Sequence, residues 1–196
     1  MNMEKYDLKH LTQPLNQVVF GPIQDDEALF LYSIIKSLRF KRIIEIGGGT
    51  MGYSGKNFSK SVGDCGVVYI VDIIDVPITE KNQILIKKNA SLVSPEDFDN
   101  SPVDMVFFDC HVYEPSMACY QTLLKGGIIT DKTIIALHDT NLLPDGTVHQ
   151  PVERMMVNDF SDMGYHIFNL HTTPEVHDSE LPFRLGVSIC QKYKRL

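Results

Sequence analysis

Three glycines, Gly47, Gly49 and Gly52, follow a short hydrophobic run at residues 42–46 and have the spacing G-x-G-x-x-G. In such a turn the first glycine permits a tight bend, the second lets a ligand approach the main chain, and the third lets a helix pack on a strand. Asp72 ends the next hydrophobic run, where its carboxylate can accept hydrogen bonds from both hydroxyls of a ribose. The pattern therefore predicts a turn that binds the nucleoside part of a cofactor.

A second set of polar residues follows two later hydrophobic runs. Asp109 and His111 follow one run, and His138, Asp139 and Asn141 follow the next. Carboxylate and amide oxygens suit hard divalent cations, so Asp109, Asp139 and Asn141 could bind Mg²⁺, Mn²⁺ or Ca²⁺. Such an ion lowers the pKa of a hydroxyl group that it coordinates. His111 could then accept the proton, because imidazole titrates near neutral pH.

Each of these residues also has a purely structural interpretation. Asp109 and Asp139 could cap the helices that follow them, and Glu45 could cap the glycine turn. His138 could be a buried core histidine, or a group that orients Asp139. These alternatives stay open at the level of the sequence.

The residues between these sites alternate between strand and helix patterns. Strands are expected at residues 42–46, 67–72, 84–86, 104–109, 133–138, 165–170 and 184–190. Helices are expected from Asp25 onward and at residues 53–62, 112–125 and 151–163. This order predicts an α/β fold with a doubly wound, Rossmann-like sheet, mostly parallel with an antiparallel last strand. Because parallel strands end at one edge of a sheet, both polar sets should meet in one crevice.

Apolar stripes at helical spacing should pack these helices on the sheet. Residues 24–27 supply capping oxygens and negative charge for the first helix. The expected stripes are Ala28, Leu31, Ile34, Ile35 and Leu38; Tyr113, Met117, Tyr120 and Leu124; and Val152, Met155, Met156 and Phe160.

The 196 residues fit a single domain, residues 1–196, in which residues 1–20 form an N-terminal cap segment. Two irregular segments, residues 141–150 and 171–183, are expected to be loops that line a pocket with this cap. No segment has the length of about 20 apolar residues that crosses a bilayer, and no secretion signal opens the chain. A cytoplasmic location with no membrane partner is expected, and a homo-oligomer stays open.

Composition and charge limit the kinds of partner that the chain is expected to bind. The formal net charge is −7, and the chain has no basic cluster beyond Lys192, Lys194 and Arg195, which disfavours a nucleic acid as partner. The four cysteines show no C-x-x-C pair, so neither a zinc site nor a disulfide framework is indicated. A small-molecule acceptor fits this composition better than a polyanion.

Five motifs together resemble class I S-adenosylmethionine-dependent O-methyltransferases. The resemblance is closest to the group that includes macrocin-type sugar O-methyltransferases and cephalosporin hydroxylase-like proteins. The motifs are residues 45–49, 52–54, 107–113, 124–127 and 137–140. The resemblance implies metal ligands at Asp109 and Asp139 and a catalytic base at His111. It implies cofactor contacts at Glu45, Gly47, Gly49, Gly52, Tyr53, Ser54, Asp72, Asn89 and Asp109.

The chain also departs from the pattern of that group. The turn from Asp109 to His111 is shorter by a Gly-Asp pair than is usual in that group, and Val112 stands where catechol-type relatives have a lysine base. The function expected is methyl transfer from S-adenosylmethionine to a hydroxyl of a sugar or natural product, assisted by a divalent cation. The alternatives are a metal-independent enzyme with His111 as base, a nicotinamide-dependent oxidoreductase, against which Glu45 counts, and a protein that holds the cofactor without catalysis.

Overall fold

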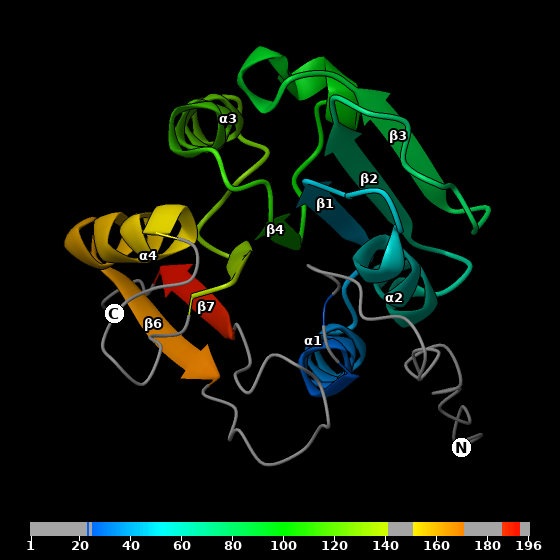
Figure 1. The fold of residues 1–196 in the computed structure, drawn as a ribbon, viewed down its shortest axis with the longest axis horizontal. Coiled ribbons are helices and arrows are strands. Elements are labelled where there is room, and N and C mark those ends of the chain that lie inside the picture. Colours follow the sequence, from blue (N-terminus) through cyan, green and yellow to red (C-terminus); the bar gives the residue numbers. More distant parts are fainter. Residues whose placement is uncertain (1–22, 24, 141–150, 171–185, 193–196) are drawn as a thin grey trace.

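The computed structural model describes residue 23 and residues 25–140, 151–170 and 186–192. Within these residues seven strands form one sheet in the order β3-β2-β1-β4-β5-β7-β6 (Figure 1). The strands are β1 (Arg42–Ile46), β2 (Val67–Asp72), β3 (Gln83–Lys87), β4 (Met105–Phe108), β5 (Ile134–His138), β6 (Tyr165–Leu170) and β7 (Val187–Lys192). β7 is antiparallel to both of its neighbours, β5 and β6, and all the other pairs, from β3 across to β5, are parallel. The predicted fold class is confirmed.

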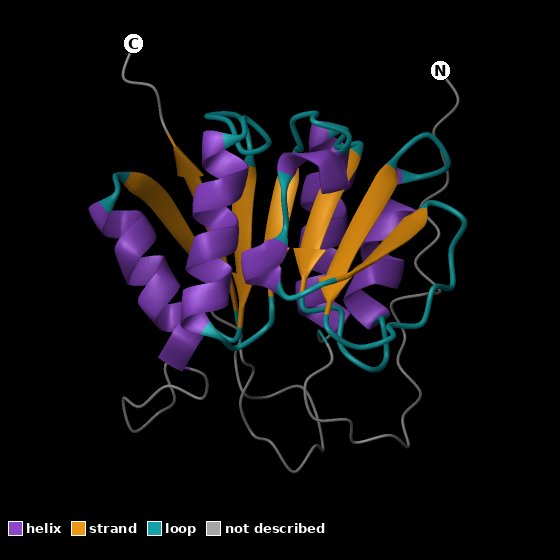
Figure 2. Cartoon of the chain, turned by 90° about the horizontal axis from the view of Figure 1, so that it is seen from above, coloured by secondary structure: helices purple, strands orange, loops and turns teal. Residues whose placement is uncertain are grey.

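Helices cover both faces of the sheet, with α1 and α2 on one face and α3 and α4 on the other (Figures 1 and 2). The helices are α1 (Asp25–Leu38), α2 (Tyr53–Val62), α3 (Tyr113–Lys125) and α4 (Pro151–Asp162), with 3₁₀ turns η2 (Ala90–Leu92) and η3 (Pro95–Phe98). None of the described helices has the length and hydropathy needed to cross a bilayer.

The central strands are buried on both faces, which explains why they are almost continuous apolar runs. Successive side chains alternate between the two faces. Ile43, Phe107 and Ala136 pack with α1 and α2, whereas Phe108 and Leu137 pack with α3 and α4. By the same alternation, Glu45, Asp109 and His138 are directed toward the face that α1 and α2 cover.

The register brings the carboxyl ends of the parallel strands level with one another. Ile46 pairs with Val71 on one side and with Phe108 on the other, and Phe108 pairs with Leu137. The residues that follow these ends, Gly47, Asp72, Asp109 and Asp139, therefore lie along one edge of the sheet, as the parallel order predicts.

The buried faces of the helices differ from the apolar stripes predicted from the sequence. Leu38, Leu124 and Met155 are exposed, and the buried face of α4 consists of Glu153, Met156, Val157 and Phe160. The predicted stripe of α4 is displaced around the helix, because a prediction from apolar residues assigns the charged Glu153 to the exposed face. Glu27 in α1 is buried in the same way, on the face of Leu31 and Ile35, so it is not merely a charge for the start of the helix.

Candidate active site

The turn between β1 and α2 uses all three glycines in left-handed conformations. The φ angles of Gly47, Gly49 and Gly52 are 93°, 62° and 63°, a region that side chains other than glycine adopt at a cost. A Cβ atom on Gly47 would lie 2.4 Å from the main-chain oxygen of Asp109, so this glycine lets the two loops touch. A Cβ atom on Gly49 would meet nothing within 4 Å. The turn is therefore tight against Asp109 and open above Gly49.

The structure joins this turn to Asp72 at the end of β2. The Asp72 carboxylate accepts hydrogen bonds from the main-chain nitrogens of Gly49 at 3.0 Å and of Ile74 at 3.1 Å. The acid predicted to hold a ribose thus lies directly beside the glycine turn, although the two are 23 residues apart.

Three further residues were predicted to contact the cofactor. Glu45 and Ser54 lie together below the turn, whereas Asn89 lies at the start of η2. Glu45 is fully buried below the turn, where Ser54 Oγ donates a hydrogen bond to its carboxylate. Burial raises the pKa of Glu45 to about 8, although the bond from Ser54 acts to lower it. Asn89 caps η2 by accepting a hydrogen bond from the Ser91 main-chain nitrogen, and Tyr53 begins α2.

His138 and Asp139 form the buried floor of the second polar set, and the partly exposed Asp109 lies beside them. His138 Nδ1 lies 3.2 Å from Asp109 Oδ1 and 3.1 Å from Asp139 Oδ1. Burial acts to lower the pKa of His138, but the carboxylates around the ring, those of Asp109, Asp139 and Glu27, raise it well above its ordinary value. Burial raises the pKa of Asp139 to about 6. His138 therefore contacts both candidate metal ligands, as its interpretation as an orienting group requires.

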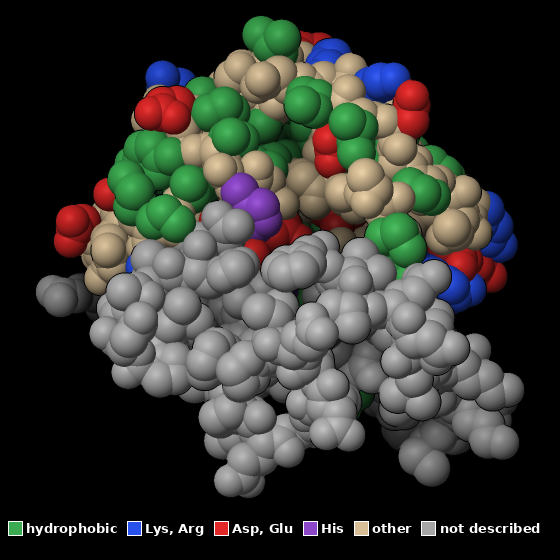
Figure 3. Space-filling view, in the orientation of Figure 1, with side chains coloured by type: hydrophobic (Ala, Val, Ile, Leu, Met, Phe, Trp, Pro, Cys, Tyr) green, Lys and Arg blue, Asp and Glu red, His purple; other side chains and the backbone are tan. Residues whose placement is uncertain are grey.

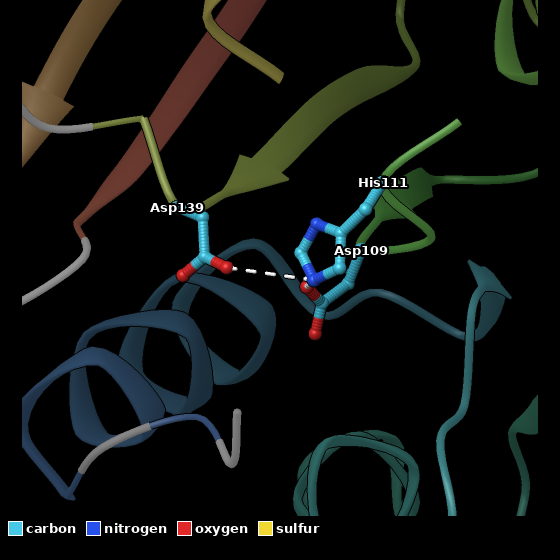
Figure 4. A group of neighbouring side chains, drawn as sticks. All are labelled: Asp109, His111 and Asp139. Atoms are coloured by element: carbon cyan, nitrogen blue, oxygen red, sulfur yellow. Dashed lines mark ion pairs between the residues drawn. The ribbon is translucent and has the colours of Figure 1, made fainter. Parts of the chain in front are cut away.

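His111 faces the same two aspartates from the open side. Its Nε2 atom lies 3.7 Å from Asp109 Oδ1 and 3.6 Å from Asp139 Oδ2 (Figure 4). Its Nδ1 atom and its main-chain nitrogen both contact Glu153 Oε1. The bond with Glu153 raises the pKa of His111, against the effect of burial. About a third of the His111 side chain is exposed. In Figure 3 histidine and acidic side chains come to the surface together on this face.

Two of these residues hold unfavourable backbone conformations. His111 has a φ of 55° and Asp139 a φ of 56°, which costs a residue with a side chain about 1 kcal/mol or more. The simple capping interpretation does not apply to Asp109, because α3 begins after Val112 with no side-chain cap. Nor does Asp139 cap α4, which begins at Pro151. Asn141, the third predicted metal ligand, lies outside the described residues, as do residues 1–20, 141–150 and 171–183.

The residues that the sequence placed at one edge can hold a metal ion together. Asp109, His111 and Asp139 each offer one donor atom, and these atoms lie within 4.8 Å of one another. The two carboxylate oxygens suit Mg²⁺ or Mn²⁺, whereas the imidazole nitrogen suits softer transition-metal ions such as Fe²⁺ or Zn²⁺. The two aspartates thus fit the predicted hard ion, and His111 adds a nitrogen that the sequence interpretation assigns to base catalysis.

Glu27 and Glu153 do not stand out as site residues in the sequence. Both are charged residues inside the apolar face of a helix, Glu27 with Leu31 and Ile35 and Glu153 with Val157. An ionisable side chain at such a position is almost never buried without a partner. This spacing is the signal that could have revealed them.

The fold is similar to that of solved methyltransferases. An O-methyltransferase of Bacillus cereus solved with S-adenosylhomocysteine is 15% identical, covers 89% of this chain and 84% of its own, and has a TM-score of 0.60. The O-methyltransferase TomG of Streptomyces achromogenes is involved in tomaymycin synthesis and was solved with S-adenosylmethionine. It is 12% identical in sequence, the match covers 89% of this chain and 82% of TomG, and the TM-score is 0.60. A methyltransferase of Podospora anserina bound to S-adenosylhomocysteine is 15% identical in sequence. The match covers 86% of this chain and 78% of that protein, with a TM-score of 0.56.

No model of a known protein family matches the sequence, and no curated protein sequence does either. At identities of 12 to 15%, the structural similarity establishes the methyltransferase fold, and the site itself must support the chemistry.

Proposed function

We propose that this protein is a methyltransferase that transfers a methyl group from S-adenosylmethionine to a hydroxyl of a small molecule, of the sugar or natural-product type, assisted by a divalent cation. One observation carries the proposal: the glycine turn with Asp72 and the group of Asp109, His111 and Asp139 lie along one edge of a sheet that has the methyltransferase fold. The contact between Gly47 and Asp109 makes these two parts adjacent.

The cofactor would bind at the turn. The open space above Gly49 and the carboxylate of Asp72 beside it fit a ribose, and the acidic surroundings favour a sulfonium cation. When bound, S-adenosylmethionine supplies an electrophilic methyl group, and a divalent cation lowers the pKa of a hydroxyl that it coordinates. Asp109 and Asp139 would hold the cation.

His111 would act as the base in this proposal. Its Nε2 atom faces both aspartates, so it would take the proton of an acceptor hydroxyl bound beside them. Glu153 fixes the ring through Nδ1 and would stabilise the positive charge that the ring acquires. The resemblance of the five motifs to macrocin-type sugar O-methyltransferases supports a hydroxylated acceptor of that kind.

One observation favours a second candidate, the same reaction without a metal ion. His138 Nδ1 lies within 3.2 Å of both aspartates, and a positively charged ring there would offset their mutual repulsion. Asp109 and Asp139 would then shape the acceptor pocket, and His111 alone would activate the hydroxyl.

The two candidates are separated by turnover with and without metal. The chain is incubated with S-adenosylmethionine and a panel of sugars, phenols and polyketide alcohols, and S-adenosylhomocysteine formation is measured with Mg²⁺, with Mn²⁺ and after EDTA. Turnover lost in EDTA and restored by the ion supports the first candidate, and turnover unaffected by EDTA supports the second. Tight binding of NAD⁺ but not of S-adenosylhomocysteine would rule out both.

A further inference from the structure

Glu27 lies on α1, far from the candidate ligands in sequence, yet it touches the floor of the site. Its side chain is fully buried. Glu27 Oε2 lies 3.0 Å from Nε2 of His138, and Glu27 Oε1 accepts a hydrogen bond of 2.8 Å from the main-chain nitrogen of Gly186, the residue before β7. One carboxylate thus links the first helix, the end of β5 and the beginning of β7.

The His138 ring is held at both of its nitrogens. Nε2 faces Glu27, and Nδ1 faces Asp109 and Asp139 at 3.2 and 3.1 Å. A half-turn of the ring about its Cβ–Cγ bond would replace these nitrogens by carbon atoms and leave the carboxylates of Glu27, Asp109 and Asp139 facing carbon. The contact with Glu27 therefore opposes the one ring rotation that would release the two aspartates.

We propose that Glu27 is a positioning residue for the candidate metal centre, which it serves by fixing His138 so that one ring nitrogen contacts both Asp109 and Asp139. The part of this inference that concerns the ion depends on the proposed function, whereas the effect on His138 does not. Partners that orient metal ligands from behind typically change metal affinity 10- to 100-fold when they are removed. Glu27 would act on the metal ligands indirectly, through His138.

The replacement Glu27→Gln tests this with little change of shape. The His138 Nε2–H and the Gly186 N–H both need an acceptor, and a glutamine side chain offers a single oxygen and a nitrogen that donates. The variant can keep both contacts only if a neutral His138 carries its proton on Nδ1 and accepts at Nε2, so the ring must either change its protonation or lose a contact. Ser33→Ala is the matched control on α1, because Ser33 is exposed and its hydroxyl donates a hydrogen bond to the Leu29 main-chain oxygen one turn earlier in the same helix.

Calorimetric titration with Mn²⁺ gives the first measurement. We expect Glu27→Gln to bind Mn²⁺ about 10-fold or more weakly than the wild type, and Ser33→Ala to bind it equally well. Equal affinity in wild type and Glu27→Gln would overturn the inference while leaving the metal-assisted function intact. Should Glu27→Gln fail to fold by circular dichroism, Glu27→Asp keeps the charge, withdraws it by one methylene group, and is expected to show the same loss.

The second measurement needs no metal. Long-range ¹H–¹⁵N spectra of the metal-free proteins record the ring signals of His138, which are assigned with a His138→Gln sample. We expect the chemical shifts of these signals to change in Glu27→Gln and to be unchanged in Ser33→Ala. Unchanged His138 signals in the folded Glu27→Gln variant would overturn the inference even if the wild type binds Mn²⁺. A wild type that binds no Mn²⁺ would instead count against the metal-assisted function, and the spectra would still decide the role of Glu27.

Discussion

Glu153 and His111 are joined by two contacts to the same carboxylate oxygen. Glu153 Oε1 accepts a hydrogen bond of 2.9 Å from the His111 main-chain nitrogen and lies 3.0 Å from Nδ1 of the ring. The first contact holds the backbone in its left-handed conformation, and the second directs Nε2 toward Asp109 and Asp139. A residue of α4 thereby sets the position of the proposed base.

Glu153→Ala should therefore impair catalysis more than binding. Without the carboxylate the His111 ring can rotate away, and we expect the turnover number to fall about 10- to 100-fold with the KM for the acceptor nearly unchanged. Steady-state methylation of the acceptor identified in the panel measures both constants. Glu114→Gln, an exposed glutamate on α3, is the control. A rise in KM alone would show that Glu153 acts on binding instead.

His111→Ala distinguishes a base from a metal ligand. If His111 is the base, turnover should fall about 10²- to 10⁴-fold while the affinity for Mn²⁺ changes little. Titration calorimetry and the same methylation assay give the two values. A loss of Mn²⁺ affinity comparable with the loss in Asp139→Asn would assign Nε2 to the ion, as the 4.8 Å grouping of the three donor atoms allows.

Asp72→Ala should weaken cofactor binding. A hydrogen bond to a charged group contributes about 1.5 to 3 kcal/mol, so the affinity for S-adenosylhomocysteine should fall roughly 10- to 100-fold. Asp75→Ala is a close control, because Asp75 is an exposed carboxylate that pairs with Lys87. Equal affinities in the two variants would contradict the assignment of Asp72 to the ribose.

Glu45→Gln should change how stability depends on pH. The folded pKa of Glu45 is about 8, above the ordinary value of 4.5, so between these values the folded chain holds a proton that the unfolded chain has lost. The stabilisation is complete below about pH 4.5 and is lost as the pH rises through about 8. Relative to Glu45→Gln, the wild type should lose up to about 1.4 kcal/mol of unfolding free energy per pH unit across this range.

Urea denaturation of both proteins from pH 5 to pH 9 measures this difference, with Glu114→Gln as the control for removal of a surface carboxylate. Parallel stability curves for wild type and Glu45→Gln would mean that the Glu45 carboxyl is ionised in the folded protein throughout the range.

Much of the fold could be predicted because its signals are local. The apolar runs at β1, β2, β4 and β5 are long enough to be buried on both faces, and the glycine spacing marks the first turn. Parallel order then places Asp72, Asp109 and Asp139 at one edge. The helix faces were harder to predict, because a charged residue such as Glu153 is assigned to solvent by its type, although its spacing from Val157 places it on the buried face.

The pattern of side chains predicts which strands end in acids and on which edge those acids lie, because strand period and parallel topology follow from it. The side chains that surround these acids are known only from the packing of the folded chain. Glu27 and Glu153 have the sequence appearance of solvated helix charges, and their roles depend on how α1 and α4 pack against the sheet. Contacts between residues as far apart as 111 positions, such as that of Glu27 with His138, arise from this packing and leave no local periodicity that would reveal the partner.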